Sequence, residues 1–178
     1  MKKVFYPLAA SFLLLTSAKL AFTPQDYKVK EGHSIAFKSK DPSGIFKDAK
    51  GSVKFDENDL ENSSIDLTFK VNSISTGNGM MNKKAQTEEW FDADKHPEIK
   101  FESTKIAKSG DAFNVLGNLT IKGITKAKKV PMKVTKSGND LVLTGTFGVN
   151  RIEYKVGKKS DAVPDVMNIT YSIPVTKK

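Results

Sequence analysis

The hydrophobic and polar residues of this chain alternate with a period of two over most of its length. The clearest stretch is 65–71, where Ile65, Leu67, Phe69 and Val71 alternate with polar residues. Successive side chains of a β-strand point to opposite faces, so this pattern predicts a strand with one buried apolar face and one solvent-exposed polar face. Similar patterns occur at 35–37, 53–55, 99–101, 113–121, 130–134, 141–149 and 167–175.

These stretches predict about eight strands in a single all-β domain. Turn signals such as Ser109-Gly110-Asp111 and Ser137-Gly138-Asn139 separate several of them, which favours a largely antiparallel sheet. A sheet with one apolar face must bury that face, either by closing into a barrel or by packing against a second sheet. Closure at this strand number leaves room only for side chains or for one slim ligand. Pro131 and Pro174 lie within strand patterns and predict edge or bulge positions.

The segment 79–91 breaks the alternation. Sparse apolar residues stand there among two lysines, one glutamine and two glutamates, which predicts a short helix or an ordered loop over one barrel end. Asn78 is the predicted N-cap, because its side chain can accept hydrogen bonds from the free N–H groups of a first helical turn. Trp90 and Phe91, at the end of the segment, are interpreted either as a structural plug or as part of a lid beside the pocket mouth.

The first residues have the pattern of an export signal. A basic start precedes the apolar run 4–15, and small residues at 16–18 supply a cleavage site. The run is too short to span a bilayer as a mature helix. We therefore predict a signal peptide over residues 1–18, a barrel domain over 19–178, and a periplasmic or secreted location. The chain contains no cysteine, so neither a lipoprotein thiol nor a disulfide is expected.

The positive charge of the chain does not indicate a nucleic-acid partner. There are 29 Lys and Arg against 20 Asp and Glu, and loss of Lys2 and Lys3 with the signal lowers the formal net charge from +9 to +7. Arg151 is the sole arginine, whereas nucleic-acid readers favour arginine for bidentate contacts. Scattered lysines are typical of a solvated barrel exterior. Peripheral contact with an anionic membrane surface stays open, because it needs only diffuse charge.

Residues suited to catalysis or metal binding are few. His33 and His96 are the two histidines, and neither lies in a nucleophile motif such as G-x-S-x-G. Ser34 follows His33 directly, so on a strand the two side chains would point to opposite faces and form no dyad. A metal site needs three or four ligands at characteristic spacing. We therefore predict no enzyme activity, no metal and no cofactor.

Several short motifs follow one another in a definite order after residue 18. They are His33-Ser34-Ile35-Ala36-Phe37, Gly51-Ser52-Val53-Lys54-Phe55-Asp56, Asn72-Ser73-Ile74-Ser75-Thr76-Gly77-Asn78, Trp90-Phe91-Asp92 with Pro97, Phe101 and Ser103, Gly117-Asn118-Leu119-Thr120-Ile121-Lys122-Gly123-Ile124-Thr125, and Asn150-Arg151. Their order resembles that of the YceI-like family of exported, lipocalin-like polyisoprenoid-binding barrels, and the resemblance runs along most of the chain after residue 18. It implies an antiparallel eight-stranded lipocalin-like β-barrel with a short helical segment capping one end.

The resemblance and the apolar inward positions together predict a carrier or storage protein. Its expected ligand is a long-chain isoprenoid-type lipid, such as a quinone or polyprenyl tail, held without covalent chemistry. The alternative is an exported stress-related or structural barrel that is filled by its own side chains. Lys70, Lys100, Asn114 and Thr146 are predicted to face outward. The predicted ligand contacts are Phe37, Phe55, Phe69, Trp90, Phe91, Phe101, Phe113, Leu143, Phe147, Ile169 and Tyr171.

Overall fold

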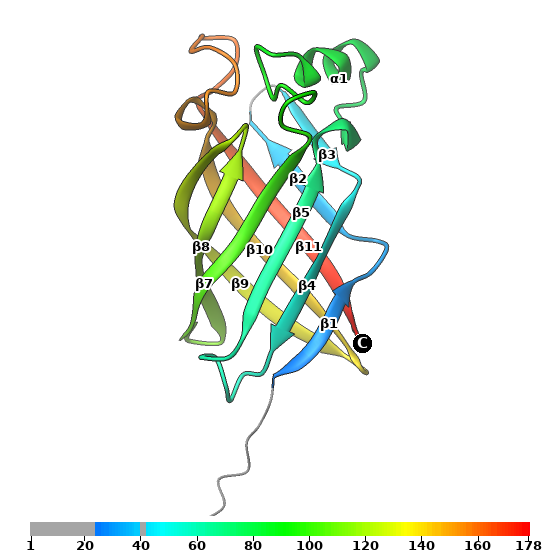
Figure 1. The fold of residues 1–178 in the computed structure, drawn as a ribbon, viewed down its shortest axis with the longest axis vertical. Helices are drawn as coiled ribbons and strands as arrows, with labels where there is room; N and C mark the ends of the chain where they lie inside the picture. The colour runs from blue at the N-terminus through cyan, green and yellow to red at the C-terminus, as the bar shows by residue number, and fades with distance from the viewer. Residues whose placement is uncertain (1–23, 40–41) are drawn as a thin grey trace, which may run out of the picture.

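One antiparallel sheet forms almost the whole of the computed structural model, which describes residues 24–39 and 42–178 (Figure 1). The predicted signal peptide, 1–18, and the first residues of the predicted domain lie outside this part of the chain. The strands are β1 (Gln25–Val29), β2 (Ser34–Lys38), β3 (Ser43–Phe46), β4 (Ala49–Phe55), β5 (Ser64–Lys70), β6 (Ile74–Ser75), β7 (Glu98–Ser109), β8 (Ala112–Ile121), β9 (Ile124–Ser137), β10 (Asp140–Asn150) and β11 (Val166–Lys177).

The sheet closes into a barrel because β1 pairs with both β4 and β11. Three barrel strands are interrupted near one end, where the short strands β2, β3 and β6 continue them: β2 pairs with β11, β3 pairs with β2, and β6 pairs with β3. When β1 with β2, β3 with β4 and β5 with β6 are each counted as one strand, the barrel has the eight antiparallel strands that the hydrophobic alternation predicts. The three short interruptions were not predicted, because a break in pairing leaves the alternation on either side unchanged.

Both prolines flagged in the sequence lie where the strand ladder is interrupted. Pro174 stands between the part of β11 that pairs with β1 and the part that pairs with β2, and its carbonyl accepts from the Lys30 N–H at 2.9 Å. Pro131 lies just beyond the last β9–β10 pair, Lys133 with Thr144. Proline has no N–H to donate to a ladder, so both positions are places where a neighbouring strand separates.

The alternation predicted from sequence sets the two faces of the barrel wall. Phe69, Phe101 and their apolar neighbours are buried inside, whereas Lys100 and Thr146 are exposed. The Lys70 ammonium contacts the Glu98 carboxylate at 2.8 Å. Lys70 and Glu98 are direct cross-strand partners on β5 and β7. The apolar side chains therefore form one continuous core within the barrel.

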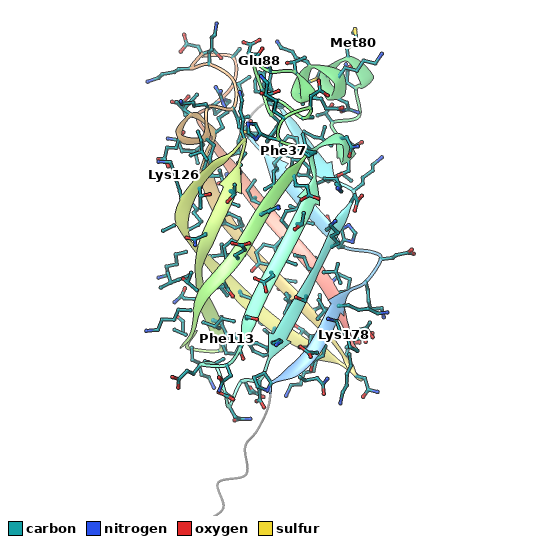
Figure 2. All side chains as sticks on the ribbon, in the orientation of Figure 1. Phe37, Met80, Glu88, Phe113, Lys126 and Lys178 are labelled. Carbon is teal, nitrogen blue, oxygen red and sulfur yellow. The ribbon has the colours of Figure 1, made fainter. Side chains whose placement is uncertain are left out.

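The cap at one end of the barrel contains α1 (Gly79–Gln86), the loop that follows it, and the segment after η2 (Arg151–Tyr154) (Figure 1). The Asn78 side chain accepts hydrogen bonds from the N–H groups of Met80 and Met81 at 2.9 and 3.2 Å, which confirms the predicted N-cap. Figure 2 shows Met80 on this cap, Phe37 just beneath it and Phe113 at the opposite end. Among the described residues, helices are too short or too polar to cross a membrane.

Candidate ligand-binding cavity

An apolar cavity of about 400 Å³ occupies the barrel interior beneath the cap. Pockets for small ligands in proteins commonly measure about 300 to 1,000 Å³, so the space is sufficient for a slim guest. All but two of the predicted ligand contacts line it: Phe37, Phe69, Trp90, Phe91, Phe101, Leu143, Phe147, Ile169 and Tyr171.

Phe55 and Phe113 are the two exceptions, because neither belongs to the cavity lining. Their rings meet edge to face at the end of the barrel opposite the cap, with centroids 5.2 Å apart and an interplanar angle of 87°. Val53, Ile106 and Val175 are also buried but do not line the cavity. The alternation places these side chains inside correctly, yet they fill one end of the barrel as a solid core.

Several lining residues were missed in the sequence. Phe46 lies on the short strand β3, and its ring packs against Phe37 at 5.9 Å and edge-on against Phe91 at 6.0 Å. Met81 comes from the cap helix, while Val156 and Val163 come from the segment after η2. Each of them stands alone in a short strand, a helix or a loop without an apolar period of two, so the alternation could not reveal them.

Glycines on neighbouring strands allow inward aromatic rings to lie along the barrel wall. A Cβ on Gly117 would stand 2.6 Å from Phe101 Cζ, and one on Gly145 would stand 2.7 Å from the Tyr171 hydroxyl. A Cβ on Gly44 would likewise approach Phe37 Cζ at 2.6 Å. Because each ring covers the bare backbone of a glycine instead of projecting inward, space is left along the barrel axis.

The ladder between β9 and β10 is only partial. Residues 133–137 of β9 pair with residues 140–144 of β10. Nearer the cap, β9 pairs only with β8 and β10 only with β11, and this unpaired stretch between β9 and β10 is called the open seam. At the end of the ladder, the Tyr171 hydroxyl donates to the Pro131 carbonyl at 2.7 Å. Lys126 shares a sheet face with its partner Leu119, yet its side chain is exposed beside this seam (Figure 2).

Arg151 ties the segment after η2 to the cap. Its guanidinium is buried and lies 5.6 Å from the Trp90 ring centroid, in a cation–π contact. The Asp165 carboxylate is 3.7 Å away. The guanidinium donates to four backbone carbonyls, at Val156, Lys158, Val163 and Pro164. Burial of this charge is compensated by these bonds, so the sole arginine of the chain holds one wall of the cavity mouth.

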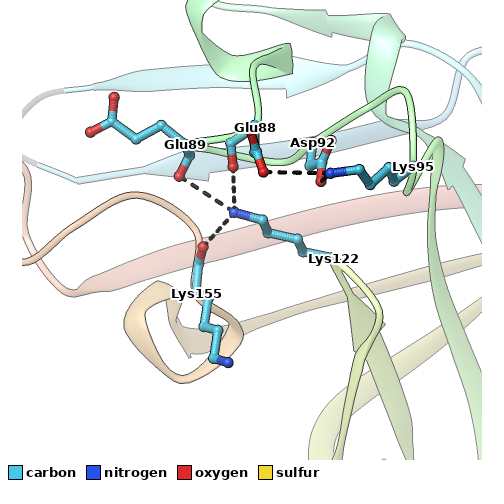
Figure 3. Close-up of polar contacts among 6 residues, drawn as sticks. All are labelled: Glu88, Glu89, Asp92, Lys95, Lys122 and Lys155. Atoms are coloured by element: carbon cyan, nitrogen blue, oxygen red, sulfur yellow. Dashed lines mark hydrogen bonds and ion pairs between the residues drawn. The ribbon is translucent and has the colours of Figure 1, made fainter.

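A second basic residue, Lys122, joins the barrel rim to two segments of the cap (Figure 3). The Lys122 ammonium, on the β8–β9 turn, donates to the carbonyls of Glu88 and Lys155 at 2.7 and 2.9 Å. Lys95 forms ion pairs with Glu88 and Asp92 at 3.4 and 3.5 Å. Lys122 therefore fixes the loop that carries Trp90 and Phe91 to the barrel rim, and the Lys95 ion pairs link two parts of this loop to each other.

The histidines have structural surroundings. His33 lies at the break between β1 and β2, where its Nε2 accepts from the Ala49 N–H at 3.1 Å and its Nδ1 lies 3.1 Å from the Lys30 carbonyl oxygen. His96 packs over Gly123, where an added Cβ would stand 2.7 Å from the ring. Within residues 24–39 and 42–178, no group of three or more His, Cys, Asp or Glu side chains could hold a metal ion.

Burial affects one titratable group of the cavity wall. It raises the pKa of the Tyr171 hydroxyl well above its usual range. The hydroxyl is therefore protonated at physiological pH and serves as the donor to Pro131.

The family model for the YceI-like domain matches residues 22–175. The chain belongs to the YceI-like family. A UPF0312 protein from Serratia proteamaculans is 32% identical over 148 residues, which cover 79% of this chain and 76% of that protein. One from Pectobacterium atrosepticum is 32% identical over 147 residues, with the same coverage of 79% and 76%.

Several solved structures have the same fold. BcnA from Burkholderia cenocepacia has a TM-score of 0.79 at 29% identity, over 83% of this chain and 99% of that one. The Campylobacter jejuni YCEI protein has a TM-score of 0.72 at 21% identity, over 79% and 88%. A polyisoprenoid binding domain from Saccharophagus degradans, implicated in plant cell wall breakdown, has a TM-score of 0.68 at 11% identity, over 87% and 99%.

Proposed function

We propose that this protein is an exported carrier or store that binds a long-chain isoprenoid-type lipid in its barrel. The observation that carries the proposal is the cavity itself, which is lined almost entirely by aliphatic and aromatic side chains of the barrel strands. Such a lining offers shape and apolar contact, which suit a hydrocarbon tail of the quinone or polyprenyl kind. Binding of this kind needs no covalent chemistry, so a binding protein is favoured over an enzyme.

The energetics of burial support this choice. Burying an apolar tail contributes roughly 25 cal/mol for each Å² removed from water. A tail of several isoprene units would bury several hundred Å², so the gross stabilisation is on the order of 10 kcal/mol before entropy losses. A lipid held this strongly is expected to stay bound during purification.

Membership of the family and the fold shared with a polyisoprenoid binding domain support the ligand class. The carrier role rests on the predicted signal peptide, which would deliver the protein to the periplasm or medium. Contact with an anionic membrane surface would allow the protein to collect or deliver its lipid. The exposed Lys126 beside the open β9–β10 seam supports such a contact.

Native mass spectrometry of protein purified from cells tests the proposal, together with mass spectrometry of its organic extract. We expect an added mass that organic solvent releases as an isoprenoid-type lipid. Ile169→Trp narrows the cavity and should reduce occupancy, whereas Thr170→Trp, on the exposed face of the same strand, should leave it unchanged. Persistent detection of the ligand-free mass alone, under conditions that preserve known lipocalin complexes, would favour the alternative of a ligand-free structural barrel.

A further inference from the structure

The open seam borders the cavity directly. Val130 on its β9 edge and Phe147 and Val149 on its β10 edge line the cavity, and all three belong to the stretch in which the two strands are not paired. Where a strand ladder is missing, side-chain packing closes the wall without backbone hydrogen bonds between the strands. The seam is therefore the part of the cavity wall that can open without breaking the ladder.

The cap is fastened by polar contacts that the seam lacks. The Arg151 guanidinium donates to four backbone carbonyls of the segment after η2. The Lys122 ammonium donates to carbonyls in both cap segments, and the Gly157 N–H donates to the Glu89 carbonyl at 2.9 Å. A lipid that entered between the cap segments would break several of these bonds, each of which contributes to stability.

Basic residues concentrate at one edge of the seam. Residues 124–139 contain five lysines and neither Asp nor Glu. The two lysines in the paired part of β9 contact acidic side chains at 3.9 and 2.9 Å. The other three, Lys126, Lys128 and Lys129, lie along the open seam, and none of them forms an ion pair with another described residue. Their charge is available to an anionic partner.

Two of these lysines occupy inward positions of the strand alternation. Lys126 is the partner of the buried Leu119, and Lys128 is the partner of Gly117. Neither lines the cavity, and the Lys126 side chain is exposed at the β9 edge (Figure 2). A lysine at an inward position is costly in a closed barrel, but beside a gap its long side chain can keep the ammonium in water. An anionic head group that passes the seam would meet these ammonium groups.

Exposed apolar side chains flank the lysines. Leu116 on β8 is 42% exposed and is the direct partner of Lys129. Val166 on β11 is 52% exposed, and its Cγ1 would stand 3.3 Å from a Cβ added to Gly148 at the β10 edge. The surrounding strand residues 112–121, 141–150 and 166–176 include no charged residue. We call this surface the seam face; it consists of Leu116, Lys126, Lys128, Lys129 and Val166.

The seam face combines exposed apolar side chains with uncompensated positive charge, which suits the surface of an anionic bilayer. The cap offers the more exposed Met80, at 79%. In the cap segments 79–95 and 151–165, however, basic and acidic residues are equal in number. An anionic surface would gain no net attraction there, so the distribution of charge favours the seam face.

We propose that the seam face docks on an anionic lipid bilayer and that the open seam is the entrance through which the lipid passes sideways between the bilayer and the cavity. This inference rests on the proposed lipid-binding function and adds to it the membrane partner and the route of entry. The lysines at the seam hold the bilayer surface, while the apolar tail moves between β9 and β10.

Sedimentation with vesicles tests the docking face. We expect the wild-type protein to bind phosphatidylcholine vesicles that contain phosphatidylglycerol and to release them in high salt, because salt screens the attraction. Lys126→Gln, Lys128→Gln and Lys129→Gln combined should weaken this binding about 100-fold, at about fivefold for each lysine. Leu116→Ser with Val166→Ser keeps the charge and should weaken binding several-fold, because less apolar surface enters the bilayer.

The matched control removes three exposed lysines from the β1–β4 side of the barrel, namely Lys28→Gln, Lys47→Gln and Lys54→Gln. It makes the same change in net charge and should alter vesicle binding by no more than about threefold. An equal loss in both triple variants would assign the binding to diffuse charge and overturn the docking face. Absence of wild-type binding to anionic vesicles would overturn it as well.

Cross-linking tests the route, and each introduced cysteine pair is unique because the chain contains no cysteine. Lys129→Cys with Thr146→Cys places two exposed thiols at opposite edges of the seam, where a short bismaleimide joins them. Anionic vesicles carrying geranylgeraniol supply the lipid, high salt and sedimentation remove them, and native mass spectrometry follows the loaded fraction of the protein. The cross-link should slow loading about tenfold relative to the same variant before cross-linking, with the final occupancy unchanged.

Two cross-linked controls locate the effect. Thr135→Cys with Val142→Cys joins direct partners in the paired ladder, and Glu89→Cys with Lys155→Cys joins the two cap segments. Both should load within about twofold of their rates before cross-linking. Slowing by the cap cross-link, or no slowing by the seam cross-link, would overturn the seam as the entrance. Failure of the wild-type protein to bind geranylgeraniol even from detergent solution would instead contradict the proposed function.

Discussion

The Tyr171 hydroxyl donates a 2.7 Å hydrogen bond to the Pro131 carbonyl, across the backbone of Gly145 on the strand between them. This bond lies where the β9–β10 ladder ends, because Pro131 lacks the N–H that would continue it. Gly145 is required for it, since a Cβ there would stand 2.2 Å from the Pro131 oxygen. The Tyr171 side chain thereby links β11 to β9 across β10, at the point where the paired part of the β9–β10 ladder meets the open seam.

Tyr171→Phe should lower the free energy of unfolding by about 0.5 to 1.5 kcal/mol, because the ring is kept but one part-buried hydrogen bond is lost. Urea denaturation followed by circular dichroism measures this change. Tyr154→Phe is the matched control, because Tyr154 is also buried and its hydroxyl makes no side-chain hydrogen bond among the described residues. A loss of the same size in both variants would show that the Pro131 contact contributes nothing specific.

Phe113→Ala and Phe147→Ala should have different effects on stability and on stabilisation by bound lipid, although both residues face inward. Phe113 is packed against Phe55 in the solid end, so its truncation should cost about 3 to 5 kcal/mol with or without lipid. Phe147 is half-buried in the cavity wall, so its truncation should cost less in the lipid-free protein and should reduce stabilisation by bound lipid. Thermal melts of both variants, with and without extracted lipid, make the comparison. Lys70→Ala, on the outer face, is expected to leave lipid binding unchanged. Equal lipid effects for Phe113→Ala and Phe147→Ala would contradict the division of the barrel into solid and hollow parts.

Gly117→Ala should destabilise the barrel and reduce lipid occupancy together. The added Cβ would stand 2.6 Å from the Glu102 carbonyl and 2.6 Å from Phe101 Cζ, so the ring must move from the wall toward the cavity. Denaturation and native mass spectrometry measure the two effects. Gly79→Ala is the control, because nothing lies within 4 Å of its added Cβ, and it should be neutral or slightly stabilising at the start of α1. Normal occupancy in Gly117→Ala would show that this glycine does not maintain the cavity.

Glu98 should make stability depend on acidic pH. The hydrogen bond from Lys70, supported by Lys100 and Lys50, lowers its pKa from 4.5 to about 2. A carboxylate whose pKa is lowered on folding contributes stability above its unfolded pKa and loses that contribution as the pH falls through the folded value. The difference in urea midpoint between wild type and Glu98→Gln should therefore be present above about pH 5 and disappear toward pH 2. A difference that stays constant over this range would show that the carboxylate charge is not responsible.

Export should remove the predicted signal peptide by cleavage after Ala18. The basic start, the apolar run 4–15 and the small residues at 16–18 together predict a mature N-terminus near Lys19. Intact-mass measurement of periplasmic or secreted protein checks this. A soluble cytoplasmic species that retains Met1 would contradict the export prediction.

Much of the barrel could be predicted from the sequence because side-chain alternation is a local property. The period of two marks the inward face of each strand, and Asn78 marks the start of α1, since both depend on residues a few positions apart. Pro131 and Pro174 predicted edge or bulge positions, because the missing N–H of proline is a local property as well. The order of motifs resembling the YceI-like family was confirmed by the match over residues 22–175.

Alternation specifies which face of a strand is apolar, but not the height of a residue along the barrel axis. Phe69 and Phe113 have the same local pattern, yet Phe69 lines the cavity and Phe113 fills the closed end. That difference depends on strand register, which brings Phe55 and Phe113 together from distant parts of the chain. The surroundings of the Trp90 ring likewise include Arg151 and Gly157, which are far away in sequence. The sequence by itself thus determined the closed wall and its apolar lining, whereas only tertiary packing decided where the barrel is hollow and where it is filled by side chains.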